Sequence, residues 1–342
     1  MTQTLSTQVM GRPALLGGRL ALLTTLLAMS LLASLLIGAN QLSPGALWDA
    51  ARGAGSSEAN YILFGQRLPR TVAGVVVGIC LGVAGCLTQA FTRNPLADPG
   101  ILGVNAGAGV LVAVGVAFFS LHTPAHIMWL ACLGALLVTL AVYGIGSRAS
   151  VNDSPLRLLL AGVALGAALS GVTTGIVLTH PDAFDRLRGW NAGTLLERGY
   201  EVSLPASGML LIGVVLALAS APGLNSMILG SDVAKSQGVS VRRNQVLVLA
   251  AVTLLAGAAT AVAGPIAFIG LMVPHVARWV VGPNQVHIVL VTLLIAPLFV
   301  LLCDVLGRVL VLPGEMPVGV MVAFVGGPVL IALVRRKEGT GL

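Results

Sequence analysis

Apolar runs, most of them close to the length that crosses a bilayer, recur along the whole chain. A transmembrane helix needs about 20 consecutive apolar residues. The chain is 56% hydrophobic and only 9% charged, whereas a soluble domain carries roughly 25% charged residues. We therefore predict an all-α polytopic membrane protein with about ten transmembrane helices and one transmembrane domain over residues 1–342. The ten runs lie near residues 20–38, 68–90, 100–119, 126–146, 156–179, 204–221, 244–263, 265–282, 287–303 and 316–334.

Two of these runs need a separate interpretation. The first follows Arg12 and Arg19, but it exceeds the roughly 7–15 apolar residues of a signal peptide, so we interpret it as an uncleaved first span. The eighth, "GPIAFIGLMVPHVARWVV", contains two prolines, a histidine and an arginine. We expect a short or broken helix there, because irregular backbone at membrane depth requires protein or water around it.

The distribution of charge predicts the orientation. An even number of spans places both termini on one side of the membrane. If that side is the cytoplasm, the inside segments hold twelve of the nineteen Lys and Arg residues and have a net charge of +8, against −1 outside, for the total of +7. The positive-inside rule favours this arrangement. We therefore expect residues 1–19 and 335–342 to be cytoplasmic tails, and the basic balance gives no support for a nucleic-acid partner.

The 43 glycines are too many to serve in loops alone. Small residues allow transmembrane helices to approach closely, which is how such helices pack where no hydrophobic force acts between them. The stretch "GVVVGICLGVAG" places Gly74, Gly78, Gly82 and Gly85 close to one helical face. We expect these glycines to pack against other helices.

The chain lacks the signatures of nucleotide binding and of common catalysis. GxxxxGK[ST], HExxH and GxSxG are absent, so no phosphate-binding loop supplies ATP hydrolysis within this chain. Cys80, Cys86, Cys132 and Cys303 lie in or beside apolar runs without CxxC spacing, which is typical of small buried hydrophobes. We predict that the protein is not an enzyme and needs no cofactor or metal.

Helix-breaking residues are concentrated in "RNPLADPGILGVNAGAG", Arg93 to Gly109, on the predicted cytoplasmic side. Asn94-Pro95 and Asp98-Pro99 favour turns, and Asp98 is placed to cap a helix whose first residue is Pro99. Asn105 then lies within the third span. A capped turn explains much of the stretch, and a position beside a transport path is the alternative, because polar backbone at membrane depth usually lines a cavity.

The longest cytoplasmic loop, residues 221–243, is predicted to form a compact surface element. Ser231 is a candidate N-cap, "DVAKSQ" a short helix and Gly238 its C′ residue, and Ser240 can cap a second short helix that contains Arg242 and Arg243. The loop is either a solvated connector or a docking element for a cytoplasmic partner.

Three arginines stand at the predicted outer face. Arg70 of "RLPR" falls in the first turn of the second span, where a cation is unfavourable by roughly 0.3–1 kcal/mol. This placement suggests an acidic partner for Arg67 and Arg70. Arg308 follows Asp304 at i,i+4, and a plain helix ion pair is the alternative explanation for it.

Several long motifs point to one family. The segments are "RLPRTVAGVVVGICLGVAGCLTQAFTRNPLADPGILGVNAGAG", "RLLLAGVALG", "LRGWNAGTLL", "GSDVAKSQGV", "AGPIAFIGLMVPHVARWVVG" and "EMPVGVMVAFVGGPVLIALVRRK". They resemble the permease subunits of type II ABC importers for ferric siderophores, haem and cobalamin, and look closest to ferric-catecholate permeases of the enterobactin type. The resemblance covers about residues 35 to 337.

The resemblance implies ten helices per subunit, a second permease subunit (an identical copy or a paralogue), a cytoplasmic ABC ATPase dimer and a periplasmic substrate-binding protein, at the bacterial inner membrane. It implies that Arg67, Arg70 and Arg308 dock the binding protein. It places ATPase coupling in the cytoplasmic loop, at Ser231, Asp232, Lys235, Gly238, Arg242 and Arg243. It places the translocation path and gate near Asn94, Pro95, Asp98, Asn105, Pro155 and Leu156.

The expected function is passage of a ferric siderophore, driven by a separate ATPase. Haem and cobalamin are alternative cargoes for the same architecture. An ion-coupled secondary transporter is less favoured because it needs ionisable residues within the spans, which here hold few acids and lysines. A membrane scaffold without a path is a third alternative.

Overall fold

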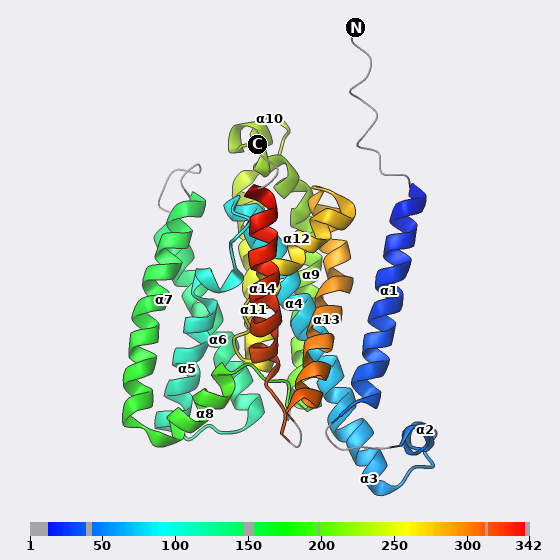
Figure 1. Cartoon of the computed structure of the whole chain (residues 1–342). Helices are drawn as coiled ribbons and strands as arrows, with labels where there is room; N and C mark the ends of the chain where they lie inside the picture. Colours follow the sequence, from blue (N-terminus) through cyan, green and yellow to red (C-terminus); the bar gives the residue numbers. More distant parts are fainter. Residues whose placement is uncertain (1–12, 39–42, 147–153, 197–198, 312–313, 339–342) are drawn as a thin grey trace.

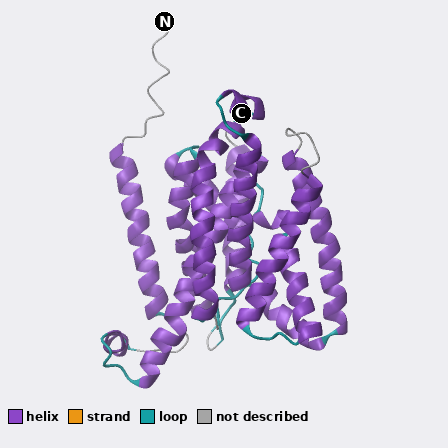
Figure 2. Cartoon of the chain, turned by 180° about the vertical axis from the view of Figure 1, so that it is seen from behind, coloured by secondary structure: helices purple, strands orange, loops and turns teal. Residues whose placement is uncertain are grey.

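The computed structural model describes residues 13–38, 43–146, 154–196, 199–311 and 314–338, and all regular elements in these ranges are helices (Figures 1 and 2). The elements, in chain order, are α1 (Pro13–Leu36), α2 (Pro44–Ala51), α3 (Ser57–Asn60), the π-helix η1 (Tyr61–Arg67), α4 (Leu68–Thr92), the 3₁₀-helix η2 (Pro99–Leu102), α5 (Val104–Phe119), α6 (Pro124–Gly146), α7 (Ser154–Thr179), α8 (Pro181–Asn191), α9 (Tyr200–Ile228), α10 (Ser231–Ser236), α11 (Val241–Ala263), α12 (Ile269–Val281), α13 (Gln285–Leu310) and α14 (Val318–Glu338).

The long helices run side by side along one bundle axis (Figure 1). Helices α4 and α11 form its centre, since 83% and 78% of their most apolar windows are buried, against 11% for α1 and 6% for α7 at the periphery. α10 projects from one end of the bundle and α8 lies at the other, and α1 begins and α14 ends at the α10 end (Figure 1). The two terminal helices therefore point their chain ends to the same side, as an even number of spans requires.

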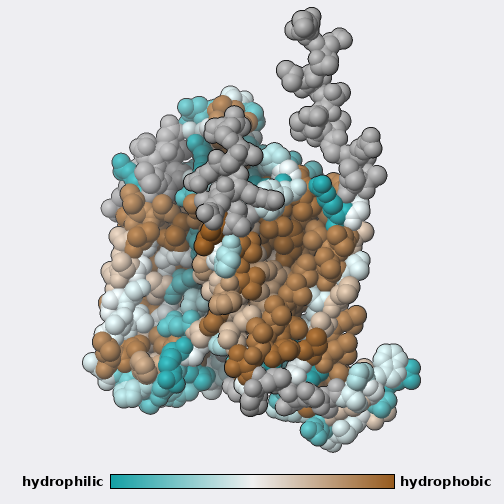
Figure 3. All heavy atoms as spheres, viewed as in Figure 1, coloured by the Kyte–Doolittle hydropathy of each residue, from teal (hydrophilic) through white to brown (hydrophobic). Residues whose placement is uncertain are grey.

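Seven helices are long and apolar enough to cross a membrane. They are α1, the continuous helix formed by α3, η1 and α4, and then α6, α7, α9, α11 and α13. Three shorter apolar helices, α5, α12 and α14, complete the set among the described residues. Each of the ten apolar runs therefore contains a helix, and α12 is short, as expected. Hydrophobic side chains cover much of the middle of the molecule and hydrophilic ones gather at its two ends, while the middle of the α7 side is paler (Figure 3).

Glycines create the close contacts at the centre, as the sequence predicts. A Cβ on Gly85 would lie 2.2 Å from the carbonyl oxygen of Gly270 in α12, and one on Gly78 would lie 2.7 Å from the Cα of Pro297 in α13. Real Cβ atoms do not approach so closely, so only glycine permits these helix spacings.

Two helix boundaries differ from the sequence prediction. The second span begins at Ser57 instead of near residue 68, because α3, η1 and α4 continue one another without a break. Helix α9 runs through Pro222 to Ile228, so the first residues of the predicted cytoplasmic loop are helical. A membrane helix tolerates such a proline where neighbours satisfy the freed backbone.

Candidate functional site

Arg67, Arg70 and Arg308, the three arginines predicted to dock a binding protein, lie together at the α8 end of the bundle. Arg67 ends the π-helix η1 and Arg70 lies in the first turn of α4, while Arg308 lies in the last turn of α13. Pro69 has no N–H to continue the α-helical ladder, and the wider turn precedes it, with the Leu68 N–H bonded to the Leu63 carbonyl. π-turns of this kind often occur at functional positions.

A carboxylate from α13 joins two of these arginines. Asp304 accepts hydrogen bonds from Arg70 Nε at 3.1 Å and Nη2 at 2.7 Å, and also from the Arg308 guanidinium, with Nε at 3.1 Å. Arg70 forms a second ion pair with Glu315, which precedes α14. Asp304 is 1% exposed, so these are charge-assisted contacts in a largely dehydrated place.

The same cluster holds the end of α1. Arg308 Nη1 donates to the carbonyl oxygens of Ser34 and Ile37, at 2.7 and 3.0 Å. Arg67 Nη1 donates to the carbonyls of Leu35 and Leu36, at 2.7 and 2.9 Å. The last carbonyl groups of a helix lack hydrogen-bond donors within the helix. Here the guanidinium groups of Arg308 in α13 and Arg67 in η1 donate hydrogen bonds to them.

The structure therefore encloses residues that the sequence analysis placed at a docking surface. Arg67 is 5% exposed and Arg308 is 1% exposed, and the Asp304–Arg308 ion pair named as the alternative is formed. The argument from the helix dipole was wrong for Arg70, because the preceding helical turns from Ser57 remove the free N-terminus. The acidic partners that this argument required are Asp304 and Glu315 of the same chain.

The predicted coupling loop forms a small projection at the α10 end. Gly230 and Gly238 bracket α10 with φ values of 125° and 80°, a region that glycine adopts without strain. Gly238 is the αL residue expected after the short helix. Gly230 is the N-cap in place of Ser231, which begins the helix. The second predicted short helix is the start of α11, which continues from Val241 through the bundle.

Exposed apolar and charged side chains cover this projection. Leu229 is 67% and Val233 is 40% exposed, and Asp232 accepts a hydrogen bond from Lys235 at 3.3 Å. Arg242 and Arg243 are exposed in the first turn of α11. An apolar pair surrounded by charges is the usual composition of a surface that contacts another protein.

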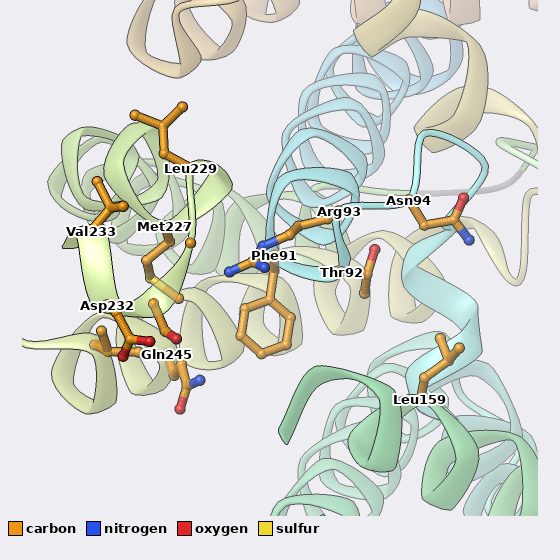
Figure 4. A pocket seen from close by; sticks show the side chains of 13 residues that line it. Phe91, Thr92, Arg93, Asn94, Leu159, Met227, Leu229, Asp232, Val233 and Gln245 are labelled. Carbon is orange, nitrogen blue, oxygen red and sulfur yellow. The ribbon is translucent and has the colours of Figure 1, made fainter. Parts of the chain in front are cut away.

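A pocket of about 700 Å³ separates this projection from the end of α4. Figure 4 shows its walls: Met227, Asp232 and Gln245 lie on one side, Phe91, Arg93 and Asn94 on the other, and Leu159 of α7 nearby. Ser231 also lines it. The predicted coupling residues Ser231 and Asp232 therefore line the same pocket as Asn94, one of the predicted path residues, although the sequence analysis treated the two groups separately.

Of the other predicted path residues whose side chains are described, Asp98 and Asn105 do not line this pocket and lie close together around Gly100. Asp98 caps the 3₁₀-helix η2, with its Oδ1 accepting from the Gly100 N–H at 2.8 Å, and α5 starts only after Gly103. Burial raises the pKa of the Asp98 carboxyl, and the bond from Gly100 opposes the rise. Asn105 accepts a hydrogen bond from Thr260 of α11 at 2.8 Å. Pro155 and Leu156 lie in the first turn of α7, and their side chains are outside the described part of the structure.

Comparison with known proteins decides the family. Residues 26–336 match the FecCD transport family. The chain belongs to the FecCD transport family. It is 47% identical over 319 residues to the ferric enterobactin transport system permease protein FepD of Escherichia coli (strain K12), covering 93% of this chain and 95% of that protein. It is 36% identical to the hemin transport system permease protein HmuU of Yersinia pestis, covering 96% and 97%.

A solved structure supports the same assignment. The inward-facing conformation of a putative metal-chelate type ABC transporter superposes with a TM-score of 0.81 at 25% identity, covering 95% of this FecCD chain and 99% of that one. Relatives that import chelated iron or haem are permease subunits of ABC importers. This multi-pass membrane protein is accordingly an ABC-importer permease subunit, of a family that is not one of enzymes.

Proposed function

We propose that this permease passes a ferric siderophore across the bacterial inner membrane. The observation that carries the proposal is the 47% identity to the ferric enterobactin permease over nearly the whole length of both chains. The YfiZ protein of Bacillus subtilis, a probable siderophore permease, is 32% identical over a similar share of this chain.

We propose that a cytoplasmic ABC ATPase dimer binds the projection formed by α10. The exposed Leu229 and Val233 supply an apolar contact, and Asp232, Lys235, Arg242 and Arg243 surround it with charges. The backbone at Gly238 fixes the angle between α10 and α11. Because α11 is a central helix of the bundle, a movement of α10 would reach the path through a rigid element.

We propose that a periplasmic binding protein docks at the arginine cluster. Three guanidinium groups and the two carboxylates of Asp304 and Glu315 leave a net charge of +1 there. Arg70, whose side chain is 12% exposed, and Glu315, at 20%, are the accessible pair. Carboxylates of the binding protein would then compete with Glu315 for Arg70. If so, Glu315→Gln should strengthen binding of the loaded binding protein, and an unchanged or weaker affinity would count against docking at this cluster.

We propose that the path runs along α7, between this chain and a second permease subunit, identical or paralogous. Helix α7 is mostly exposed in the single chain. It carries Ala167, Gly171, Thr174 and Gly175, which form a smooth and weakly polar surface. Such a surface suits a bulky chelate that must not bind tightly. Asn94 and Pro95 would lie near the cytoplasmic exit.

Haem is the second candidate cargo, because the hemin permease HmuU aligns with 96% of this chain at 36% identity. The cargo test uses the permease with its ATPase and binding protein in nanodiscs. ATP hydrolysis should rise when the binding protein is loaded with a ferric catecholate siderophore and remain basal with haem or cobalamin. Stimulation by haem alone would replace the siderophore assignment without changing the permease assignment.

A further inference from the structure

A second pocket, lined by both polar and apolar side chains, opens beside the first at the same end of the bundle. Its volume is about 490 Å³, and it lies between the end of α4, the end of α9 and the turn from α12 to α13. Its polar lining residues are Gln89, Arg93, Asn225, Arg278, Asn284 and Gln285. Among the described residues, its lining includes two arginines and no aspartate or glutamate.

Three of the four side-chain amide oxygens in this pocket, all but that of Gln285, already accept hydrogen bonds within the chain. Asn225 Oδ1 accepts from the Gln285 N–H at 2.8 Å, and Asn284 Oδ1 accepts from the Val286 N–H at 2.9 Å as the N-cap of α13. Gln89 Oε1 accepts from Arg278 Nη2. Backbone N–H groups can only donate, so they fix which way the two asparagine amides point.

Hydrogen-bond donors therefore remain for an incoming group. Among the described residues, the NH₂ groups of Asn225 and Asn284 and the Arg93 guanidinium have no hydrogen-bond acceptor, and Arg278 uses only Nη2. A site that offers donors and positive charge without a carboxylate selects an anion with several acceptor oxygens. Asp232 lines the neighbouring pocket and not this one.

We infer that this pocket receives an acidic side chain of the cytoplasmic ATPase, as a second contact beside α10. The inference rests on the proposed coupling function. Arg93 and Leu229 line both pockets, so the anion site is continuous with the proposed coupling surface. The α9–α10 turn that forms one wall projects beyond the bundle (Figure 1). An anchored carboxylate would hold the ATPase to α4 and α12 as well as to α10.

Carbodiimide cross-linking tests the contact directly, because it joins a lysine amine to a carboxylate only when the two groups touch. The permease with Arg93→Lys is purified with its ATPase, and cross-linked peptides are identified by mass spectrometry. We expect an amide bond between residue 93 and an aspartate or glutamate of the ATPase. Arg157→Lys is the matched control, since Arg157 is exposed near the start of α7 and lines neither pocket; it should give no such product.

An affinity measurement accompanies the cross-link. Arg93→Glu should weaken ATPase binding at least about tenfold, the effect expected for a charge-assisted hydrogen bond, whereas Arg157→Glu should not change it. If the ATPase co-purifies but residue 93 does not cross-link to it and Arg93→Glu binds normally, the inference is wrong and the coupling function stands. If the wild-type permease does not bind the ATPase at all, both fail.

A phospholipid headgroup is the other source of an anion at this end. Nanodiscs with only zwitterionic lipid and nanodiscs with added anionic lipid separate the two. Binding of the ATPase that depends on Arg93 in both lipids supports the inference. The inference would be overturned in favour of a lipid site if Arg93→Glu removed bound anionic lipid but left ATPase binding unchanged.

Discussion

At the scale of single residues, Asp304 carries most of the electrostatics at the α8 end. It is the one carboxylate contacted by both Arg70 and Arg308 among the described ion pairs. Burial of charged groups costs several kcal/mol per ion, and removal of one partner leaves the others uncompensated. Without Asp304, Arg70 and Arg308 lose their shared carboxylate, which also orients Arg308 toward the end of α1.

Replacement of Asp304 by asparagine should destabilise the fold by about 3–5 kcal/mol, because the buried Arg308 and the half-buried Arg70 lose their shared counter-charge. Thermal unfolding of the purified permease in detergent measures the loss. Asp185→Asn is the control, since its ion pair with Arg188 is exposed on both sides and such pairs contribute at most about 1 kcal/mol. Equal stabilities of the two variants would contradict a structural role for the cluster.

Asp98 predicts a dependence on pH. Burial raises its pKa in the folded protein, so the folded state binds the proton more tightly than the unfolded state does. Above the folded-state pKa of Asp98, the ionised carboxylate therefore lowers the free energy of unfolding. This loss disappears as the pH falls below that pKa and the carboxyl group is protonated. Asp98→Asn keeps an oxygen for the Gly100 N–H and has no charge.

We expect Asp98→Asn to be the more stable protein at pH 7, with the difference shrinking as the pH is lowered toward 4. Melting temperatures of both proteins in detergent between pH 7 and pH 4 give the comparison. A variant that is less stable at pH 7, or an advantage that grows in acid, would show that the ionised carboxylate is favoured at this cap.

At the scale of elements, Gly238 sets the orientation of α10. A Cβ at this position would meet no atom within 4 Å, so a substitution acts through φ alone, at 80°. Gly238→Val should cost roughly 1–2 kcal/mol in this conformation and weaken recovery of the ATPase in a pull-down. Gly238→Asn is the control, because asparagine tolerates the left-handed region. Equal recovery with valine and asparagine would remove the conformational argument.

Helix packing gives a second prediction at this scale. Gly85→Ala would place a methyl group 2.2 Å from the Gly270 carbonyl oxygen, so α4 and α12 must separate. Overpacking of this kind typically costs about 1–3 kcal/mol. Gly208→Ala adds the same methyl group on α9, where no atom lies within 4 Å. Thermal stability should fall for the first variant and not for the second, and equal effects would contradict the packing role.

The long helices could be predicted from the sequence because a helix that crosses a bilayer needs a long run of apolar residues. The sequence missed the start of the second span because the seven-residue π-helix η1 gives no periodic signal. It predicted two short helices in the coupling loop. Ser240 does precede the second one, although its side chain makes no capping bond, but this helix is the start of the long α11 and not a separate short element. α2 and α3 lie beside the lower end of α1 (Figure 1), and with 8 and 4 residues they are too short to give a membrane pattern.

At the scale of the whole molecule, the candidate sites depend on contacts between distant parts of the chain. The Asp304–Arg308 pair could be predicted because it lies within one helix turn. The pairing of Arg70 with Asp304, 234 positions away, could not. Nor could the use of the asparagine oxygens in the second pocket, which joins residues of α4, α9 and the α12–α13 turn. Spacing along the chain reports only local contacts.

Directional transport in proteoliposomes tests the central claim most directly. The permease, its second subunit and its ATPase are reconstituted, with the loaded binding protein on the outside and ATP on the inside. We predict accumulation of radiolabelled iron, supplied as a ferric catecholate siderophore, that requires both ATP and the binding protein and is unaffected by collapse of the proton gradient. Accumulation that persists without ATP and stops when the proton gradient is collapsed would contradict the account.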